Sequence, residues 1–440
     1  MTKDTIDAFP RKKLFIDILT QDVNAEECIL DLIDNSVDSY VKNMLTDRRE
    51  IRITLNGEKC EIYDNCGGIE KEFLKQKVFR FGTEHLDREH PTLGMYGIGL
   101  KRSVFKMGND ILFETDDGNN YSLMQMDVRE WERKEKDWSI PFETGKSKLS
   151  DGQKPYTKIR VTSLHDEIKE KFSLDPFISK ISDKLRCVYY LTMQNKIDFV
   201  FNENKLEHYN LIVPYSDDYK PSVLVGEYEG VRYRIICFID PSKGTRLNNA
   251  INQVGWNIFC NERLILANDK SKTTGWRGKD EAGYLPKYHP IFNEFRGHVF
   301  MEANNPFFLP LNTAKSDLNT ETKVYHHILE QMTKTAKPVI DYLSKKYSEQ
   351  KQREDEIEED METTSDNDFK PTMIAATEFK NTSEFKAPIK KEVKEEITNI
   401  LYSKPKKIVD VVKKHLGVSS NKEVGIKTFD YFVDAEDLNG

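Results

Sequence analysis

The chain has 440 residues, 38% of them hydrophobic and 32% charged, and it carries a formal net charge of −8. This length exceeds one ordinary hydrophobic core, so we expect two compact domains and an additional solvated segment. No uninterrupted apolar run approaches the ~20 residues that a membrane span requires, and the first residues lack the apolar stretch of a secretory signal. These features argue against a membrane or secreted protein and predict a cytoplasmic one.

The negative charge is concentrated in one segment. Residues 354–368 hold nine carboxylates and no basic residue, which leaves the other residues with a net charge of about +1. A nearly neutral body neither requires nor excludes a nucleic-acid partner. The six cysteines have no CxxC spacing and no neighbouring histidine cluster, which predicts reduced core thiols rather than a zinc site.

The N-terminal part begins with a helical pattern and a hairpin pattern. Residues 22–45 repeat apolar side chains at helical spacing, which predicts a long helix with one buried face. Residues 50–64 alternate around Asn56-Gly57, a pair that favours a two-residue turn with positive φ, so two antiparallel strands are expected.

The elements that follow complete the first domain. A short helix, a polar loop and a helix capped by Gly108 are expected over residues 73–79, 80–95 and 97–106. Strands are expected near residues 111–114, 121–126 and 158–162. Together these elements predict an α+β domain over residues 1–165, in which helices cover a mixed sheet.

Residues 166–348 predict a second domain, an α/β unit with flanking helices. Residues 166–193 have a helical pattern, and the alternating runs IDFVFN, VRYRIICFI and GWNIFCNERLIL predict strands. A helix over residues 324–347 closes this domain. Residues 349–371 are too charged and too poor in aromatics to form a core, so a disordered acidic linker is expected. Residues 372–440 predict a small C-terminal helical module.

Three polar side chains recur along the first long helix. Asp31, Asn35 and Asp38 lie at i, i+4 and i+7, so they share a face about opposite the apolar stripe. A carboxylate one turn before an amide can polarise a water molecule while the amide oxygen holds Mg²⁺, which prefers hard oxygen ligands. The alternative interpretation is an ordinary solvated helix face.

Two glycine-containing segments follow. DNCGGI, residues 64–69, ends a strand with Asp64, whose carboxylate can accept a hydrogen bond from an adenine amino group while bare backbone lets the base approach. GMYGIGLK, residues 94–101, places glycines before a helix whose free N–H groups favour phosphate, and Lys101 adds a positive charge. Each segment alone is weak, because ordinary turns have the same composition. Their order after the polar helix face favours a nucleotide site.

Together, DLIDNSVD, DNCGGI and GMYGIGLK resemble the three ATP-binding boxes of the GHKL superfamily, which includes gyrase B, MutL, sensor histidine kinases and MORC ATPases. The resemblance covers about residues 10–165 and is closest in layout to MORC- and MutL-like proteins. It implies a Bergerat-type fold, ATP and Mg²⁺ as ligands, Asp31 as a catalytic residue and Asn35 as the Mg²⁺ ligand. The ATP-binding positions that it implies are Asn35, Asp38, Asp64, Gly68, Gly82, Thr83, Gly94, Tyr96, Gly97, Ile98, Gly99, Leu100 and Lys101.

Two positions depart from the family pattern. Asp31 stands where most hydrolytic members have a glutamate as general base, and Cys66 replaces the first glycine of the adenine box. A base that is one methylene shorter must still come within about 3 Å of the attacking water, directly or through another water. We therefore expect slow turnover. Glu27, one turn earlier, is a candidate substitute for the base, and a surface or dimer-contact role is its alternative.

Beyond the three boxes, PLNTAKSDL around Lys315 is similar to the segment with which MutL- and MORC-like transducer domains send a lysine to the γ-phosphate. Such transducer domains resemble ribosomal protein S5, and the strand IFCNERLI resembles the N-x-R-L-I strand of MORC proteins. The resemblance implies that Lys315 joins Asp31 in catalysis, since a cation there neutralises charge that develops during phosphoryl transfer. The alternative is an exposed loop lysine.

The leading hypothesis is an ATP hydrolase that works as a switch. ATP orders a lid over residues 82–95, engages Lys315 and favours an N-terminal homodimer, which the resemblance alone implies. One alternative is a nucleotide-gated scaffold that binds ATP without significant hydrolysis. Another is a histidine-kinase-like protein kinase, although all nine histidines follow the first helix and no phosphoacceptor helix precedes it.

The client of the ATP cycle is left open by the sequence. The resemblance to DNA-clamping relatives makes DNA a candidate and a defence role a hypothesis, but the body lacks a dense stripe of lysine and arginine. A protein bound through the C-terminal tail is the other candidate, and the basic clusters of that tail fit a solvated helix face equally well.

Overall fold

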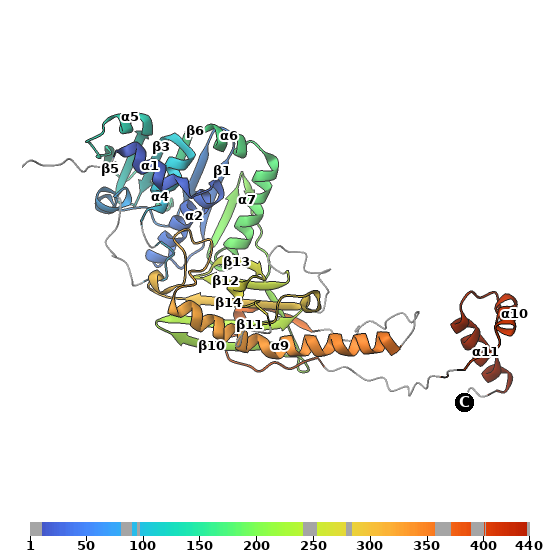
Figure 1. Cartoon of the computed structure of the whole chain (residues 1–440). Coiled ribbons are helices and arrows are strands. Elements are labelled where there is room, and N and C mark those ends of the chain that lie inside the picture. The colour runs from blue at the N-terminus through green and yellow to red at the C-terminus, as the bar shows by residue number, and fades with distance from the viewer. Residues whose placement is uncertain are drawn as a thin grey trace, which may run out of the picture. The chain divides into compact units, whose positions relative to one another are not determined.

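The computed structural model describes residues 11–80, 90–94, 97–240, 253–278, 284–356, 371–388, 400 and 402–437. The chain divides into two compact units, Met1–Ile389 and Lys390–Gly440. The first unit contains two large sheets, each with its own hydrophobic core (Figure 1). We call the first sheet with its helices the N-terminal domain (residues 11–205) and the second sheet with its long helix the central domain (residues 206–388).

The N-terminal domain is built on an eight-stranded mixed sheet. Its strands alternate inward and outward residues, as in β1, where Ile51, Ile53 and Leu55 are buried. Neighbouring strands are antiparallel, except that β1 and β7 are parallel. The strand order is β5 (Phe142–Lys146), β4 (Asn120–Asp127), β3 (Gly108–Asp116), β6 (Tyr156–Leu164), β2 (Cys60–Asp64), β1 (Arg49–Leu55), β7 (Ile197–Phe201) and β8 (Asn204–Lys205).

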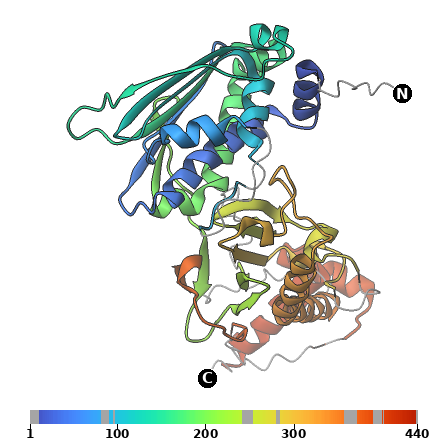
Figure 2. The ribbon, with the colours of Figure 1, turned by 90° about the vertical axis from the view of Figure 1, so that its left-hand side faces the viewer.

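Helices gather over one face of this sheet (Figures 1 and 2). The helices α2 (Ala25–Lys42) and α4 (Gly99–Met107) lie in contact, and they carry DLIDNSVD and the end of GMYGIGLK. The helix α1 (Lys12–Gln21) is fixed by Lys12, whose buried ammonium donates to the carbonyls of Trp131, Lys134 and Asp137 at 2.7, 2.8 and 2.6 Å. The remaining helical segments are α3 (Lys71–Phe73), the π-helical turn η1 (Leu74–Val78), α5 (Val128–Arg133), α6 (Asp166–Phe172), α7 (Asp175–Val188) and α8 (Tyr190–Asn195).

The central domain is a five-stranded sheet with the long helix α9 (Lys323–Glu356) packed on β10 and β11 (Figure 1). Neighbouring strands of this sheet are antiparallel, except that β12 and β14 are parallel. The strand order is β10 (Ser222–Tyr228), β11 (Val231–Ile239), β14 (Phe295–Glu302), β12 (Gly255–Cys260) and β13 (Arg263–Asp269). A separate ladder pairs β9 (Ile212–Tyr215) with β15 (Thr372–Ala375), and the 3₁₀ turns are η2 (Lys272–Thr274), η3 (Pro290–Phe292), η4 (Pro306–Phe308) and η5 (Ala376–Glu378).

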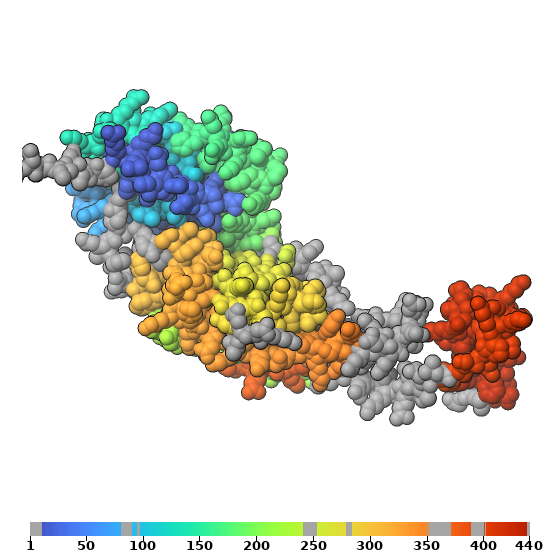
Figure 3. Space-filling model, in the orientation of Figure 1, coloured from blue at the N-terminus to red at the C-terminus, as the bar shows by residue number. Residues whose placement is uncertain are grey.

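The C-terminal unit is a helical hairpin, coloured red in Figure 3. Its described helices are α10 (Lys406–Leu416) and α11 (Asn421–Ala435). Gly417 ends α10 in the left-handed conformation, with φ 66°. Ser420 and Glu423 form a capping box that begins α11.

The predicted α+β class and the helical tail are confirmed, whereas the placement of some segments differs. IDFVFN, expected in the second domain, forms β7 and extends the N-terminal sheet beside β1. The helix expected to end at residue 347 continues to Glu356. Residues 372–388, expected in the C-terminal module, join the central domain through β15, and Ala376 is fully buried there. Periodicity identifies a strand, but it does not identify the strand's neighbour.

One local prediction, the two-residue turn at Asn56-Gly57, is wrong for a physical reason. The hairpin connection between β1 and β2 has four residues rather than two, and neither Asn56 nor Gly57 has a positive φ. A Cβ at Gly57 would lie 2.3 Å from the Oγ of Ser173, so the glycine allows close packing. Gly108 is the C-cap residue of α4, as predicted, and its N–H donates to the carbonyl of Val104. It is extended, with φ −175°, rather than left-handed, because it also begins β3.

None of the helices within the described ranges combines the length and the hydropathy that a membrane crossing requires. All six cysteines are buried as free thiols, as predicted for core residues.

Candidate functional site

The helix α2 is the centre of the candidate site. Its N-terminus is closed by a capping box, in which the Asn24 side chain accepts from the Glu27 N–H at 2.9 Å and the Glu27 carboxylate accepts from the Asn24 N–H at 3.1 Å. Twelve of its eighteen residues are buried, so the helix is held firmly in the domain. Glu27, considered above as a substitute base, serves here as a capping residue.

Asp31 is buried and lies in an ion pair. It is 2% exposed, and its Oδ2 accepts from both Nη2 and Nε of Arg102, at 2.6 and 2.7 Å. Arg102 comes from α4. This helix can approach α2 closely because residue 99 is a glycine: a Cβ there would lie 3.3 Å from the Asp31 carboxylate. The Lys315 ammonium lies 3.5 Å from Asp31 Oδ1. The predicted base therefore has two cationic neighbours.

Asp34, one turn further along α2, links the two domains. It is fully buried, and Lys315 donates to its Oδ2 at 2.7 Å. Arg263 Nε lies 3.2 Å from Oδ1, and the Tyr189 hydroxyl donates to Oδ1 at 2.8 Å. Burial alone would raise the pKa of Asp34, but the attraction of Arg263 and Lys315 outweighs burial and lowers that pKa.

Lys315 is presented by a tight turn of the central domain. Its φ is 54°, and its N–H donates to the carbonyl of Asn312 at 3.1 Å. Its carbonyl accepts from Arg263 Nη1 at 2.9 Å. Burial lowers the pKa of Lys315, but Asp34 and Asp31 together more than reverse this effect and raise it. The structure thus brings the two predicted residues, Lys315 and Asp31, close together. The shorter contact of Lys315 is with Asp34, to which no role was assigned from the sequence.

Four residues of the site, Asp34, Arg263, Tyr189 and Arg102, were not predicted from the sequence. Asp34 lies within DLIDNSVD, and Arg263 lies within the strand that resembles N-x-R-L-I, so both were inside segments already singled out. Arg102 directly follows GMYGIGLK. The sequence offered no such local signal for Tyr189.

Asp38 holds the described end of the expected lid. Its two carboxylate oxygens accept from the N–H groups of Leu93 and Gly94, each at 2.7 Å. Burial raises the pKa of Asp38. The Asn261 side chain donates to the carbonyl of Thr92 at 2.8 Å, so the turn between β12 and β13 also contacts this segment.

Asn35, the expected Mg²⁺ ligand, has a different environment from its neighbours. It is exposed, whereas Asp31 and Asp38 are 2% and 4% exposed. The face that these three residues share is therefore not uniformly solvated. An exposed amide oxygen is accessible to a metal ion that a phosphate group brings with it.

Asp64 forms the buried end of β2. Cys60, Ile62 and Asp64 occupy alternate inward positions, so the register points a carboxylate into the domain. Asp64 accepts from Ser36 Oγ at 2.7 Å and from the Cys66 N–H at 2.9 Å. Burial raises the pKa of Asp64 to about 6. Because a carboxylate offers about four acceptor positions, Asp64 retains capacity for a further donor.

Backbone conformation and close packing explain why residue 68 of the DNCGGI segment is a glycine. Gly68 has φ 67°, and a Cβ there would lie 2.3 Å from the carbonyl oxygen of Asp116. The strand β3 therefore approaches the bare backbone of the DNCGGI segment directly. Any side chain at Gly68 would force the two segments apart.

The third motif begins α4. Gly97 has φ 63°, Ile98 is the N-cap residue, and Gly99 and Leu100 form the first turn. Lys101 is 2% exposed and donates to the Gly97 carbonyl, and burial lowers its pKa to about 8. The predicted positions Gly82, Thr83 and Tyr96 lie outside the described residues.

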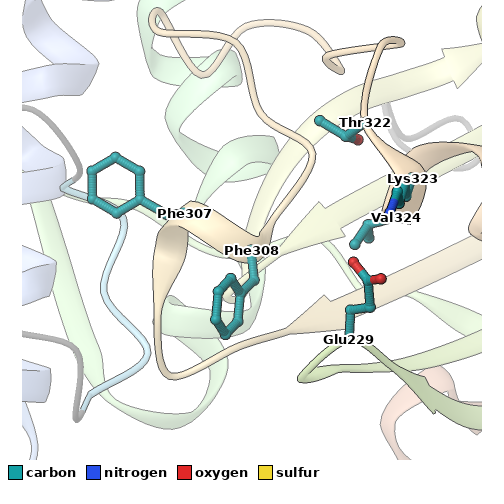
Figure 4. A pocket seen from close by; sticks show the side chains of 6 residues that line it. All are labelled: Glu229, Phe307, Phe308, Thr322, Lys323 and Val324. Carbon is teal, nitrogen blue, oxygen red and sulfur yellow. The ribbon is translucent and has the colours of Figure 1, made fainter.

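The described surface pockets lie elsewhere. One, of about 420 Å³, lies in the central domain between Phe308 on one side and Glu229 and Val324 on the other (Figure 4). A second, also of about 420 Å³, lies between α1 and α5 beside Leu14 and Arg133. Neither contains a motif residue, so the candidate site rests on the motifs.

One comparison with known proteins supports the family resemblance of the N-terminal domain. Residues 23–157 match the family model described as histidine kinase-, DNA gyrase B-, and HSP90-like ATPase. This range contains Asp31, Asn35, Asp64 and Lys101, whereas Lys315 lies outside it. A search of curated proteins finds no significant match.

Proposed function

We propose that this chain, whose residues 23–157 belong to the GHKL ATPase superfamily, is an ATP-driven switch whose central domain responds to the nucleotide through Lys315. The observation that carries the proposal is the position of the Lys315 ammonium, 2.7 Å from Asp34 and 3.5 Å from Asp31. The ammonium of a central-domain lysine thus contacts α2, the helix of the N-terminal domain that contains DLIDNSVD. A terminal phosphate beside α2 would compete with Asp34 for this cation.

The residues fit an adenine nucleotide and Mg²⁺. Asp64 offers a buried acceptor for the adenine amino group, beside the bare backbone of Gly68. The first turn of α4 offers free N–H groups to phosphate, and Lys101 is located in that turn. Asn35 would hold Mg²⁺, which neutralises phosphate charge when it is bound.

We further propose that Asp31 is the general base and that turnover is slow. In this structure the Asp31 carboxylate faces Arg102 at 2.6 Å and Lys315 at 3.5 Å. Both cations compete with a water molecule for the carboxylate oxygens. Hydrolysis therefore requires a rearrangement that frees Asp31, and the short aspartate side chain has little reach to compensate for poor positioning.

The proposed activity is tested by steady-state Mg-ATP hydrolysis of the wild type, Asp31→Asn and Glu27→Gln, with nucleotide binding measured for each. We expect Asp31→Asn to lose turnover and retain binding, because an amide cannot accept the proton of the attacking water. The matched control Glu27→Gln, one turn earlier on α2, should retain turnover. Loss of turnover in Glu27→Gln alone would refute the role of Asp31 and assign the base to Glu27.

The second candidate function is a nucleotide-gated scaffold that binds ATP without significant hydrolysis. The buried Asp31–Arg102 pair favours it, since the guanidinium occupies the carboxylate oxygen that a water molecule would otherwise contact. Tight ATP binding with equally low turnover in the wild type and Asp31→Asn would support the scaffold and contradict the ATPase.

The switch would act through an ATP-dependent N-terminal homodimer, with DNA as one candidate client, and both ideas rest on family resemblance. Mass measured by light scattering should increase with a non-hydrolysable ATP analogue, and residues 82–95 should become protected from proteolysis. Unchanged mass and unchanged proteolysis would refute the coupling. The absence of a mobility shift at low salt, with and without ATP, would refute DNA as the client.

A further inference from the structure

The two cations beside Asp31 hold it unequally. Lys315 has a closer partner of its own, since its ammonium lies 2.7 Å from Asp34 and 3.5 Å from Asp31. Arg102 has no such alternative, because Asp31 is the only carboxylate with which it pairs among the residues that the structure describes. Arg102 is therefore the cation that fixes the position of the Asp31 carboxylate.

The Arg102 guanidinium is directed at a single oxygen of Asp31. Its Nη2 and Nε lie 2.6 and 2.7 Å from Oδ2. The arginine and aspartate side chains are 9% and 2% exposed, so solvent does little to weaken the pair. Charge-assisted hydrogen bonds of this kind are about twice as strong as neutral ones. A water molecule that approaches Oδ2 has to displace both donors.

The helix α4 places Arg102 in this position. The Arg102 N–H donates to the carbonyl of Ile98 at 3.0 Å, so this residue closes the first turn of the helix. Gly99 lets that turn approach α2, because a Cβ at residue 99 would lie 3.3 Å from both Cγ and Oδ2 of Asp31. The adjacent Lys101 lies in the turn that is proposed to receive phosphate. The same turn of α4 thus serves both the phosphate and the base.

Two features of the chain are candidates for slowing hydrolysis, and they differ in the change that would relieve them. One is the short side chain of Asp31, and the other is its ion pair with Arg102. The close approach of Gly99 leaves little space for a longer side chain at residue 31. Lengthening the base would therefore crowd α4, whereas removing the guanidinium would free Oδ2 for water. The contacts favour the ion pair as the limiting feature.

We propose that Arg102 is a positioning residue that sets the rate of hydrolysis, because its ion pair with Asp31 has to open before this carboxylate can accept a proton from the attacking water. In that step the water oxygen bonds to the γ-phosphorus, the bond from this phosphorus to the ADP oxygen breaks, and the water proton passes to Asp31. The inference rests on the proposed function, in which Asp31 is the general base. Arg102 acts through Asp31 and needs no contact with the nucleotide, so the pair lowers kcat and leaves nucleotide affinity unchanged.

The test is steady-state Mg-ATP hydrolysis by the full chain and by Arg102→Met, with the affinity for a non-hydrolysable ATP analogue measured for both. We expect kcat to increase about tenfold in the variant, which corresponds to about 1.4 kcal/mol for opening the pair, while KM and the affinity for the analogue stay the same. Lys106→Met is the matched control, since Lys106 lies one turn further along α4 and donates to the Thr20 carbonyl at 3.0 Å. This control should hydrolyse ATP at the wild-type rate.

Further variants separate positioning from a structural role. Arg102→Lys retains a cation and should keep kcat near the wild-type value, whereas loss of a merely structural contact would lower kcat in Arg102→Met. Adding Asp31→Asn to Arg102→Met should abolish the gain, because the freed group is then no longer a base. If urea unfolding shows that Arg102→Met does not fold, Arg102→Gln takes its place, with an expected increase of kcat because its side chain is uncharged.

The outcomes distinguish this inference from the proposed function. Retained ATP binding with a kcat of Arg102→Met equal to or below the wild-type value would overturn the role of Arg102 and leave nucleotide binding intact. If the wild type has no measurable turnover, hydrolysis by Arg102→Met would support the proposal, and its absence in both chains would contradict it. A wild type that binds no ATP would overturn the proposed function itself, together with this inference.

Discussion

Replacing Asp34 by asparagine tests the buried ionic network between the two domains. The amide has nearly the same volume as the carboxylate, so the change removes the negative charge beside two cations without creating a cavity. Arg263 is 4% exposed and Lys315 is 9% exposed. Breaking one side of a buried ion pair costs about 3–5 kcal/mol. We expect about 3 kcal/mol here, because Lys315 still has Asp31 at 3.5 Å.

The free energy of unfolding can be followed in urea by tryptophan fluorescence, since each domain contains two tryptophans: Trp131 and Trp138, and Trp256 and Trp276. The matched control is Asp198→Asn, which breaks an ion pair with the half-exposed Arg48 and should cost about 0–1 kcal/mol. Equal effects of the two substitutions would refute the reasoning, because they would show that the buried network contributes no more than a surface pair.

The pH dependence of the Asp34→Asn effect has a defined sign. The folded-state pKa of Asp34 is lowered, because Arg263 and Lys315 outweigh burial. The carboxylate therefore contributes stability that is fully present above the unfolded pKa of about 3.9 and is lost as the pH falls through the lower folded pKa. The difference between wild type and variant should be constant near pH 7 and should shrink below about pH 4.

Three further outcomes are expected. Adenosine binding should weaken about tenfold from pH 7 to pH 5, because the pKa of Asp64 is about 6 and the adenine amino group needs an ionised carboxylate as acceptor. In Asp64→Asn the affinity for adenosine should not change over this pH range. Gly68→Ala should destabilise the N-terminal domain by about 2–3 kcal/mol in urea unfolding, whereas Gly145→Ala, where a Cβ meets nothing within 4 Å, should be nearly neutral. Lys12→Met should speed hydrogen exchange across α1, because three carbonyls lose their shared donor, and unchanged exchange would refute this anchoring.

The elements of the fold were predictable where the signal is local. The long helix, the hairpin after it and the strands near residues 111, 121 and 158 follow from periodicity, and the structure contains each of them. The neighbour of β7 was not predictable, because alternation in IDFVFN is the same beside either sheet. The hairpin turn was mispredicted at Gly57, because packing against Ser173, far along the chain, governs that position.

The residues of the candidate site were likewise predictable only where the signal is local. Asp31, Asn35 and Asp64 were predicted from spacing within one helix and one strand end. The pairing of Asp34 with Lys315 joins residues 281 positions apart, so no local pattern indicates it. The exposure of Asn35 beside two buried carboxylates also depends on packing between α2, α4 and the central domain, which sequence spacing does not determine.

The turn that carries Lys315 gives its side chain a fixed origin. A non-glycine residue with φ 54° is held in the left-handed region at a cost of about 1–2 kcal/mol, and hydrogen bonds to Asn312 and Arg263 hold it there. A displacement of the central domain away from α2 would carry this turn with it and would weaken the contact of the ammonium with Asp34, which is 2.7 Å long in the structure. We therefore expect rotation of the two domains to be coupled to loss of the ion pair between Lys315 and Asp34.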